Sequence, residues 1–197
     1  MPRASLRDQI LDAGLRVMFR KGFVGSGVRD IVSEAGAPQG SFTNHFRSKE
    51  LFARDVLDRY FDHTKALVAQ ALDDRSRPPR ERLRRYLDLI TERLAADGFT
   101  RGCLIGDFSL EAAPVSAVLR ERLAAIFAEW RGPFAACIAE AQAAGEIETV
   151  ATPDELADFL LASWEGAILR MKVERTAEPL ERFKRIAFAT IFKESDR

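Results

Sequence analysis

The sequence has little of what a disulfide-stabilised or metal-dependent protein needs. It contains two cysteines, Cys103 and Cys137, and two histidines, His45 and His63. Two cysteines cannot build a disulfide framework, and this usage is typical of a reducing compartment. A zinc or iron site needs several nitrogen or sulfur ligands at close spacing, and no cysteine lies near either histidine. We therefore expect no metal and no cofactor.

Long hydrophobic runs and an excess of one charge are also missing. No stretch approaches the roughly 18 apolar residues of a membrane span, and residues 1–8 lack the apolar segment of a signal peptide. We expect a cytoplasmic protein with no membrane partner. Hydrophobic residues make up 47% of the 197 residues and charged residues 30%. These values are typical of a globular protein and exclude a disordered or low-complexity chain.

The charges balance overall but are distributed unevenly. Thirty Lys and Arg residues face thirty Asp and Glu residues, which gives zero formal net charge. Residues 1–50 contain eight basic and five acidic residues, a net of +3, so residues 51–197 carry −3. A basic N-terminal part on an acidic body indicates nucleic acid as a partner at that end.

Hydrophobic periodicity predicts an all-α protein with about nine helices. Apolar residues recur at spacings of three and four almost throughout, with no convincing alternation of period two. Ser5 is the expected N-cap of the first helix, with Asp8 as its capping-box partner, and Gly22 its expected end. Residues 152–155, Thr-Pro-Asp-Glu, combine an N-cap, a proline at the first helical position and a capping-box glutamate.

Residues 27–46 read as a short helix, a turn at Gly36 and a second short helix with Pro38 at its first position. Such a pair can place its second helix in the DNA major groove. Phe42 and Phe46 should face inward. The exposed side chains are small or can form hydrogen bonds with base edges or phosphates: Gln39, Ser41, Thr43, Asn44 and His45. The alternative is structural, because any all-α protein contains short helix pairs with a glycine between them.

This region resembles the DNA-binding domain of tetracycline-repressor (TetR) family regulators. The resemblance rests on five segments: Gly22-Phe23, residues 28–31, residues 34–38, residues 40–42 and residues 45–51. It implies a homodimeric repressor of a (pseudo)palindromic operator in double-stranded DNA. Residues 5–65 would form the helix-turn-helix DNA-binding domain, and residues 66–197 a larger helical domain for effector binding and dimerisation.

The matching positions add Arg29, Gly40 and Lys49 to the expected DNA contacts, with Lys49 meeting a phosphate at the start of the fourth helix. This chain departs from the family pattern at one position. Many members carry tyrosine where Thr43 stands, which puts the phosphate-contact pattern in question but not the fold.

The C-terminal part is similar to the acrylate- and electrophile-responsive branch of the same family. The similar segments are residues 101–107, Arg-Gly-Cys-Leu-Ile-Gly-Asp, and residues 164–170, Trp-Glu-Gly-Ala-Ile-Leu-Arg. The resemblance implies that Cys103 senses electrophiles; a thiolate adds to activated alkenes, and Arg101 would lower the pKa of the thiol. Alternatively, Cys103 packs as a small hydrophobe and the effector binds without a covalent bond. Cys137 is expected to pack.

Aromatic residues are the candidates for lining an effector pocket between helices, although most could simply fill the core. The candidates are Phe61, Phe99, Phe108, Trp130, Phe134 and Trp164. By analogy with the family, the last two helices would pair with their copies across a two-fold axis. The expected interface residues are Trp164, Ile168, Phe183 and Phe188.

Two other functions are open. A small enzyme would need a nucleotide-binding motif or a nucleophile–base pair, and the glycines of residues 22–27 are in the wrong order for a dinucleotide fold. A helical interaction module without a DNA role is the third reading. The six arginines of residues 75–85 fit a solvated helix face better than a nucleic-acid or lipid patch. The favoured function is a ligand- or electrophile-responsive repressor, not an enzyme.

Overall fold

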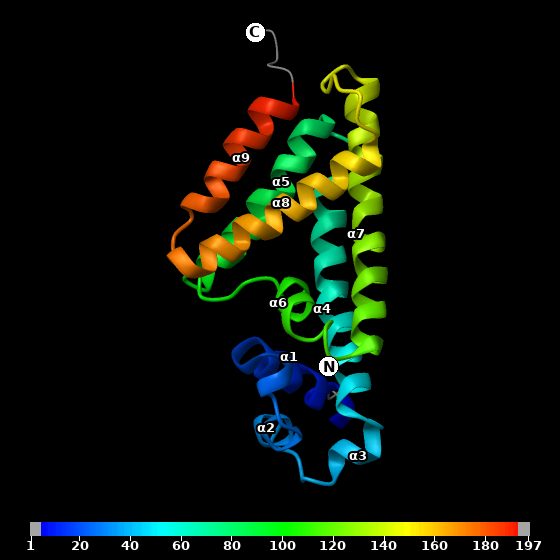
Figure 1. The fold of residues 1–197 in the computed structure, drawn as a ribbon, viewed down its shortest axis with the longest axis vertical. Helices are drawn as coiled ribbons and strands as arrows, with labels where there is room; N and C mark the ends of the chain where they lie inside the picture. Colours follow the sequence, from blue (N-terminus) through cyan, green and yellow to red (C-terminus); the bar gives the residue numbers. More distant parts are fainter. Residues whose placement is uncertain (1–4, 193–197) are drawn as a thin grey trace. The chain divides into compact units, whose positions relative to one another are not determined.

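The computed structural model describes residues 5–192, and these form nine helices (Figure 1). No strand is assigned within this range; one isolated antiparallel bridge joins Ile147 and Phe192. The all-α expectation is confirmed. The helices are α1 (Leu6–Gly25), α2 (Val28–Glu34), α3 (Ser41–His45), α4 (Lys49–Leu72), α5 (Pro79–Ala96), α6 (Leu104–Glu111), α7 (Ala117–Ala143), α8 (Pro153–Glu174) and α9 (Glu178–Ile191).

Helix starts follow the capping signals of the sequence. The Ser5 hydroxyl accepts a hydrogen bond from the Asp8 backbone N–H, as expected for the start of α1. At the start of α8, Thr152 accepts from Glu155 N–H while the Glu155 carboxylate accepts from Thr152 N–H, which completes a capping box. Satisfying these otherwise unpaired N–H groups typically contributes about 1 kcal/mol at each cap.

Helix ends and turns differ from expectation in two places. Gly22 breaks the helical geometry with φ +70°, but Phe23–Gly25 add one more turn, so α1 ends later than predicted. Gly36, at φ +61°, makes the turn after α2 as expected. The helix after it starts at Ser41 rather than Pro38, because residues 38–40 form a turn in which the Pro38 carbonyl accepts from Ser41 N–H at 2.9 Å.

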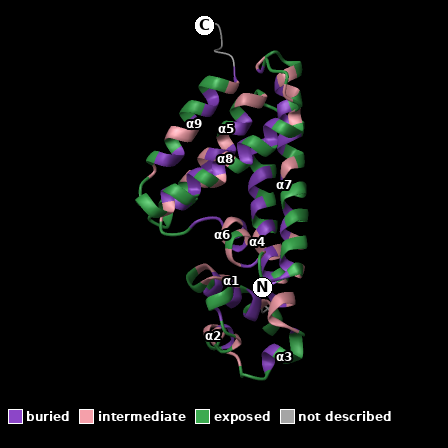
Figure 2. Ribbon diagram, in the orientation of Figure 1, coloured by how far each residue is buried: buried purple, intermediate pink, exposed green. Residues whose placement is uncertain are grey.

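Contacts divide the chain into two compact units. The first unit comprises residues 1–63 and 104–126, and the second comprises residues 64–103 and 127–197. Within the first unit, α1 packs on α2 and α6; within the second, α8 and α9 lie side by side. Buried and exposed residues alternate along the helices, as amphipathic helices require (Figure 2). None of the helices in residues 5–192 has the length and hydropathy to cross a bilayer.

Candidate DNA interface and effector site

The short helix α3 exposes most of the side chains that the sequence marks for DNA contact. Gln39, Thr43, Asn44 and His45 are exposed, as is the backbone at Gly40. The Thr43 hydroxyl donates to the Gly40 carbonyl at 3.0 Å. Ser41 differs, because its side chain is buried with 7% exposure. A buried hydroxyl at the first position of α3 cannot read a base edge without a rearrangement of the helix.

An aromatic cluster beneath α3 holds this helix in place. Phe42 and Phe46 lie one turn apart, with ring centroids 5.3 Å from each other, and both contact Phe52 of α4 at 5.0 and 4.7 Å. All three side chains are buried, as the sequence predicts for Phe42 and Phe46. Because α3 has five residues, this packing rather than helix propensity fixes its orientation.

Most cations of residues 5–63 are neutralised by acids of the same unit. Arg16 and Arg20 both bind Glu34, at 2.9 and 2.6 Å. The others that form ion pairs are Arg7 and Arg54 with Asp55, Lys21 with Asp30, and Arg59 with Asp8 and Asp12.

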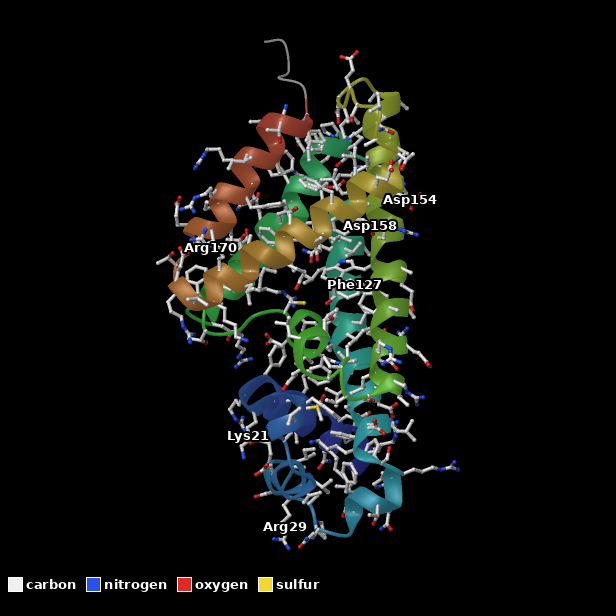
Figure 3. The ribbon with its side chains drawn as sticks, viewed as in Figure 1. Lys21, Arg29, Phe127, Asp154, Asp158 and Arg170 are labelled. Carbon is white, nitrogen blue, oxygen red and sulfur yellow. The ribbon has the colours of Figure 1, made fainter. Side chains whose placement is uncertain are left out.

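Two arginines of the described residues 5–63 form no ion pair. Arg29 is exposed on α2 and projects away from the helices (Figure 3). Arg47 is exposed just after α3. Both therefore carry positive charge that no acid among residues 5–192 offsets by an ion pair, one on each side of the turn at Gly36. Sequence reasoning missed Arg47, since the ion pairs of the competing basic residues become visible only in the fold.

Lys49 is held by its own chain. Its ammonium lies 4.6 Å from the centroid of the Phe23 ring and donates to the Val24 carbonyl at 3.4 Å. Burial lowers the pKa of this ammonium, and the negative charge of Glu111 partly offsets the effect. A phosphate contact by Lys49 would have to compete with these interactions.

Glu111, the last residue of α6, holds the end of α1. Its carboxylate accepts from the Phe23 N–H at 2.5 Å and from the Val24 N–H at 3.4 Å. The carboxylate approaches the backbone so closely that a Cβ on Gly22 would clash with it. Phe23 also packs against Phe108 of α6, with ring centroids 5.9 Å apart. The helix that follows Cys103 thus fixes the segment that leads into α2.

The predicted pocket aromatics do not all fall in one unit. Phe61 and Phe108 are buried in the first unit. In the second unit, Trp130, Phe134 and Trp164 are buried and Phe99 is half-buried. Cys103 also belongs to the second unit and is buried with 7% exposure. Arg101, expected to act on this thiol, has a half-exposed side chain 3.8 Å from Asp97.

The second unit contains a buried polar cluster around Tyr86, a residue that the sequence indicated only as core. The Tyr86 ring meets Phe134 edge-on, with centroids 4.9 Å apart. Burial raises the pKa of Tyr86 well above its usual range, and negative charge at Cys103 and Glu165 acts in the same direction. The Trp130 indole opposes this shift, although it makes no hydrogen bond of acceptable geometry with the hydroxyl.

Cys137 is buried as expected. Its thiol donates to the Pro79 carbonyl at 3.5 Å, and burial raises the pKa of the thiol to about 11. Nearby, Arg82 is almost fully buried; its guanidinium donates to the Leu72 carbonyl and pairs with Glu140. This part of the arginine-rich segment is therefore structural.

The predicted dimer residues lie mostly inside the protomer. Trp164, Ile168 and Phe188 are buried, and the Phe183 ring packs 5.3 Å from Trp164. The apolar side chains that α8 and α9 expose include Phe159 and Ile186, at 57% and 53%. They border a groove of about 260 Å³ between the two helices, whose walls also include Gly166, Arg170, Phe183 and Thr190.

Comparisons with known proteins agree with this arrangement. The family model described as "Bacterial regulatory proteins, tetR family" matches residues 10–56, and "Tetracyclin repressor-like, C-terminal domain" matches residues 79–187. The chain is 44% identical over 196 residues to the transcriptional repressor DhaR of Mycobacterium sp. (strain GP1), covering all of this chain and 97% of that protein. It is 30% identical over 179 residues to the transcriptional repressor NemR of Escherichia coli K12, covering 89% and 88%.

A solved structure also matches closely. The crystal structure of regulatory protein TetR from Rhodobacter sphaeroides superposes with a TM-score of 0.90 and 36% identity, covering 96% of this chain and all of that one. The shared sequence and fold both extend over nearly the whole chain.

Proposed function

Because the chain belongs to the tetracycline-repressor family of bacterial transcriptional regulators, we propose that it is a homodimeric repressor released from its operator by a small effector. Residues 5–65 contact the DNA, and residues 66–197 bind the effector and form the dimer. The observation that carries the proposal is the pairing of an exposed polar α3 with two uncompensated arginines, Arg29 and Arg47. The arginines supply phosphate contacts, and the Asn44 side chain forms hydrogen bonds with the edge of an adenine base.

Dimerisation uses the exposed groove of α8 and α9. A two-fold axis places the same surface of each protomer opposite itself, so Phe159 and Ile186 become buried on association. Two copies of α3 would then meet half-sites about one helical turn, or ~34 Å, apart. Ile186→Glu places a charge in this interface, and we expect a monomer in sedimentation analysis together with loss of operator binding. Val173→Glu on α8, at a position that is even more exposed but absent from the groove, is the control.

Release requires that the effector favour a dimer arrangement that cannot bind the operator. The chain itself offers a route, because α6 begins directly after Cys103 and ends at Glu111, which holds the segment before α2. Modification of Cys103, or occupation of the protein around it, would displace α6 and with it the end of α1. The covalent form of this switch requires a reactive Cys103 thiolate, and the non-covalent form does not.

The experiment follows fluorescence anisotropy of a labelled duplex from the upstream region of the encoding gene, with a scrambled duplex as competitor and at fixed salt. Acrylate or a maleimide is titrated into the unmodified protein and Cys103→Ser. Release of the unmodified protein alone identifies a thiol switch, whereas equal release of both places the effector in a non-covalent site. No preference for the upstream duplex over the scrambled one contradicts the proposal that the protein represses through this region.

A further inference from the structure

Among the buried side-chain atoms of the second unit that lack a hydrogen-bond partner within the described residues, three belong to aromatic residues. They are Tyr86 Oη, Trp130 Nε1 and Trp164 Nε1, on side chains that are at most 3% exposed. Native proteins keep few such atoms, because removing a donor from water without replacing its hydrogen bond costs free energy. Aliphatic or phenylalanine side chains could fill the same volume at no such cost. Retention of polar groups here points to a ligand or a water molecule that binds them.

Tyr86 Oη and Trp130 Nε1 lie in the same part of the second unit. Tyr86 comes from α5 and Trp130 from α7, one turn before the Phe134 ring that packs on Tyr86. The tyrosine hydroxyl lies within electrostatic reach of both Cys103 and Glu165, which α8 supplies. Segments far apart in the sequence therefore bring two neutral donors, one carboxylate and one thiol together. Trp164 lies on α8 beside Glu165 but packs against Phe183 of α9, and we leave it outside this cluster.

The chemistry of these groups selects a type of ligand. An indole N–H only donates, and a phenol that stays protonated at neutral pH also donates, so both suit a carbonyl oxygen. The carboxylate of Glu165 repels an anion and accepts from an N–H or O–H. We propose that Tyr86 and Trp130 donate to the carbonyl oxygen of an uncharged small molecule beside Cys103, and that Glu165 accepts from an N–H of the same molecule, as in a primary amide. The inference rests on the proposed function, and it adds that the effector is neutral rather than a carboxylate anion.

The test compares two probes of nearly equal shape, propionamide and propionate, at matched ionic strength. Both are saturated and cannot alkylate, and Cys103→Ser serves as the background so that only recognition is measured. The only two tryptophans of the chain are Trp130 and Trp164, so intrinsic fluorescence reports on this region. We expect propionamide to bind about tenfold more tightly than propionate, and Tyr86→Phe to weaken propionamide about tenfold, the effect of one hydrogen bond.

Glu165→Gln separates recognition from a structural role. Removing the negative charge should strengthen propionate binding and abolish the preference for propionamide. Asp158→Asn on α8 is the matched control (Figure 3). Its carboxylate is exposed and pairs with Arg131. We expect it to leave the ratio of the two affinities unchanged.

Two results would overturn the inference. One is equal or tighter binding of propionate; the other is unchanged propionamide affinity in Tyr86→Phe, which would mean that the hydroxyl only holds water. Anisotropy measured on the operator distinguishes failure of the proposed ligand site from failure of the proposed function. Binding of propionamide without release of DNA contradicts the switch but not the site. Release by another effector that is unaltered in Tyr86→Phe and Glu165→Gln contradicts the site but not the switch.

Discussion

The surface around α3 and the cluster around Tyr86 use polar groups in opposite ways. Arg29, Arg47 and Asn44 are exposed and act in water, where charge attracts the DNA backbone over a distance set by salt. Tyr86 and Trp130 are buried, where short hydrogen bonds are strong and salt hardly reaches. The first region therefore suits affinity for a long polyanion, and the second suits discrimination between small molecules. DNA binding should depend steeply on salt and effector binding should not.

The largest effect that sharpens this contrast is expected from the double change Arg29→Ala with Arg47→Ala. A dimer would lose four phosphate contacts, so the slope of log affinity against log salt should fall by about 3.6. Operator affinity at 0.15 M salt should fall by about three orders of magnitude, because release of counterions from four phosphates is lost. Anisotropy titrations at several salt concentrations measure both quantities.

The control for this change is Arg16→Ala. Arg16 is equally basic and lies on the same unit, but it pairs with Glu34, to which Arg20 still binds after the change. For Arg16→Ala, the slope of log operator affinity against log salt should match that of the unmodified protein. A slope that falls equally in both variants would mean that overall charge, rather than the two unpaired arginines, governs DNA binding.

The same contrast explains what sequence reasoning could and could not find. The spacing of apolar residues, the N-cap residues, and the glycines and prolines that end helices are all local features of the sequence. The nine helices of the described residues and the starts at Ser5 and Thr152 could therefore be predicted. The exposed positions of α3 followed from the spacing of Phe42 and Phe46. Ser41 shows the limit, since at the first position of so short a helix the periodicity does not determine which way a side chain points.

Residues that act through tertiary contacts could not be found in this way. Arg47 can be recognised as an unpaired cation only after the fold shows which other basic residues form ion pairs with acids. Tyr86, Trp130 and Glu165 are about 44 and 35 positions apart along the chain, and only packing joins them. The interior packing of Trp164 and Phe188, proposed from the sequence as dimer contacts, likewise depends on how α8 and α9 lie together.

A smaller effect is expected at Glu111, which joins α6, the helix after Cys103, to the end of α1 within the first unit. Glu111→Gln removes the charge from a carboxylate that accepts two backbone N–H bonds, and hydrogen bonds to charged groups are stronger than neutral ones. We expect a loss of about 1–2 kcal/mol in the free energy of unfolding, measured in urea, and weaker operator binding. Glu121→Gln, an exposed acid on α7, is the control. Unchanged operator affinity in Glu111→Gln would contradict the proposed route through α6.

The smallest effect concerns Cys137, which tests whether burial alone makes a thiol inert. With a pKa of about 11, its thiolate fraction at pH 8 is about one in a thousand, because each unit between pH and pKa is a factor of ten. The fraction rises as the pH approaches the pKa, so residual labelling should increase about tenfold per unit. In Cys103→Ser, we expect mass spectrometry to find almost no maleimide adduct in the folded protein and complete labelling in urea. Rapid labelling of folded Cys103→Ser would instead identify Cys137 as a second reactive thiol and remove the reason for assigning electrophile sensing to Cys103 alone.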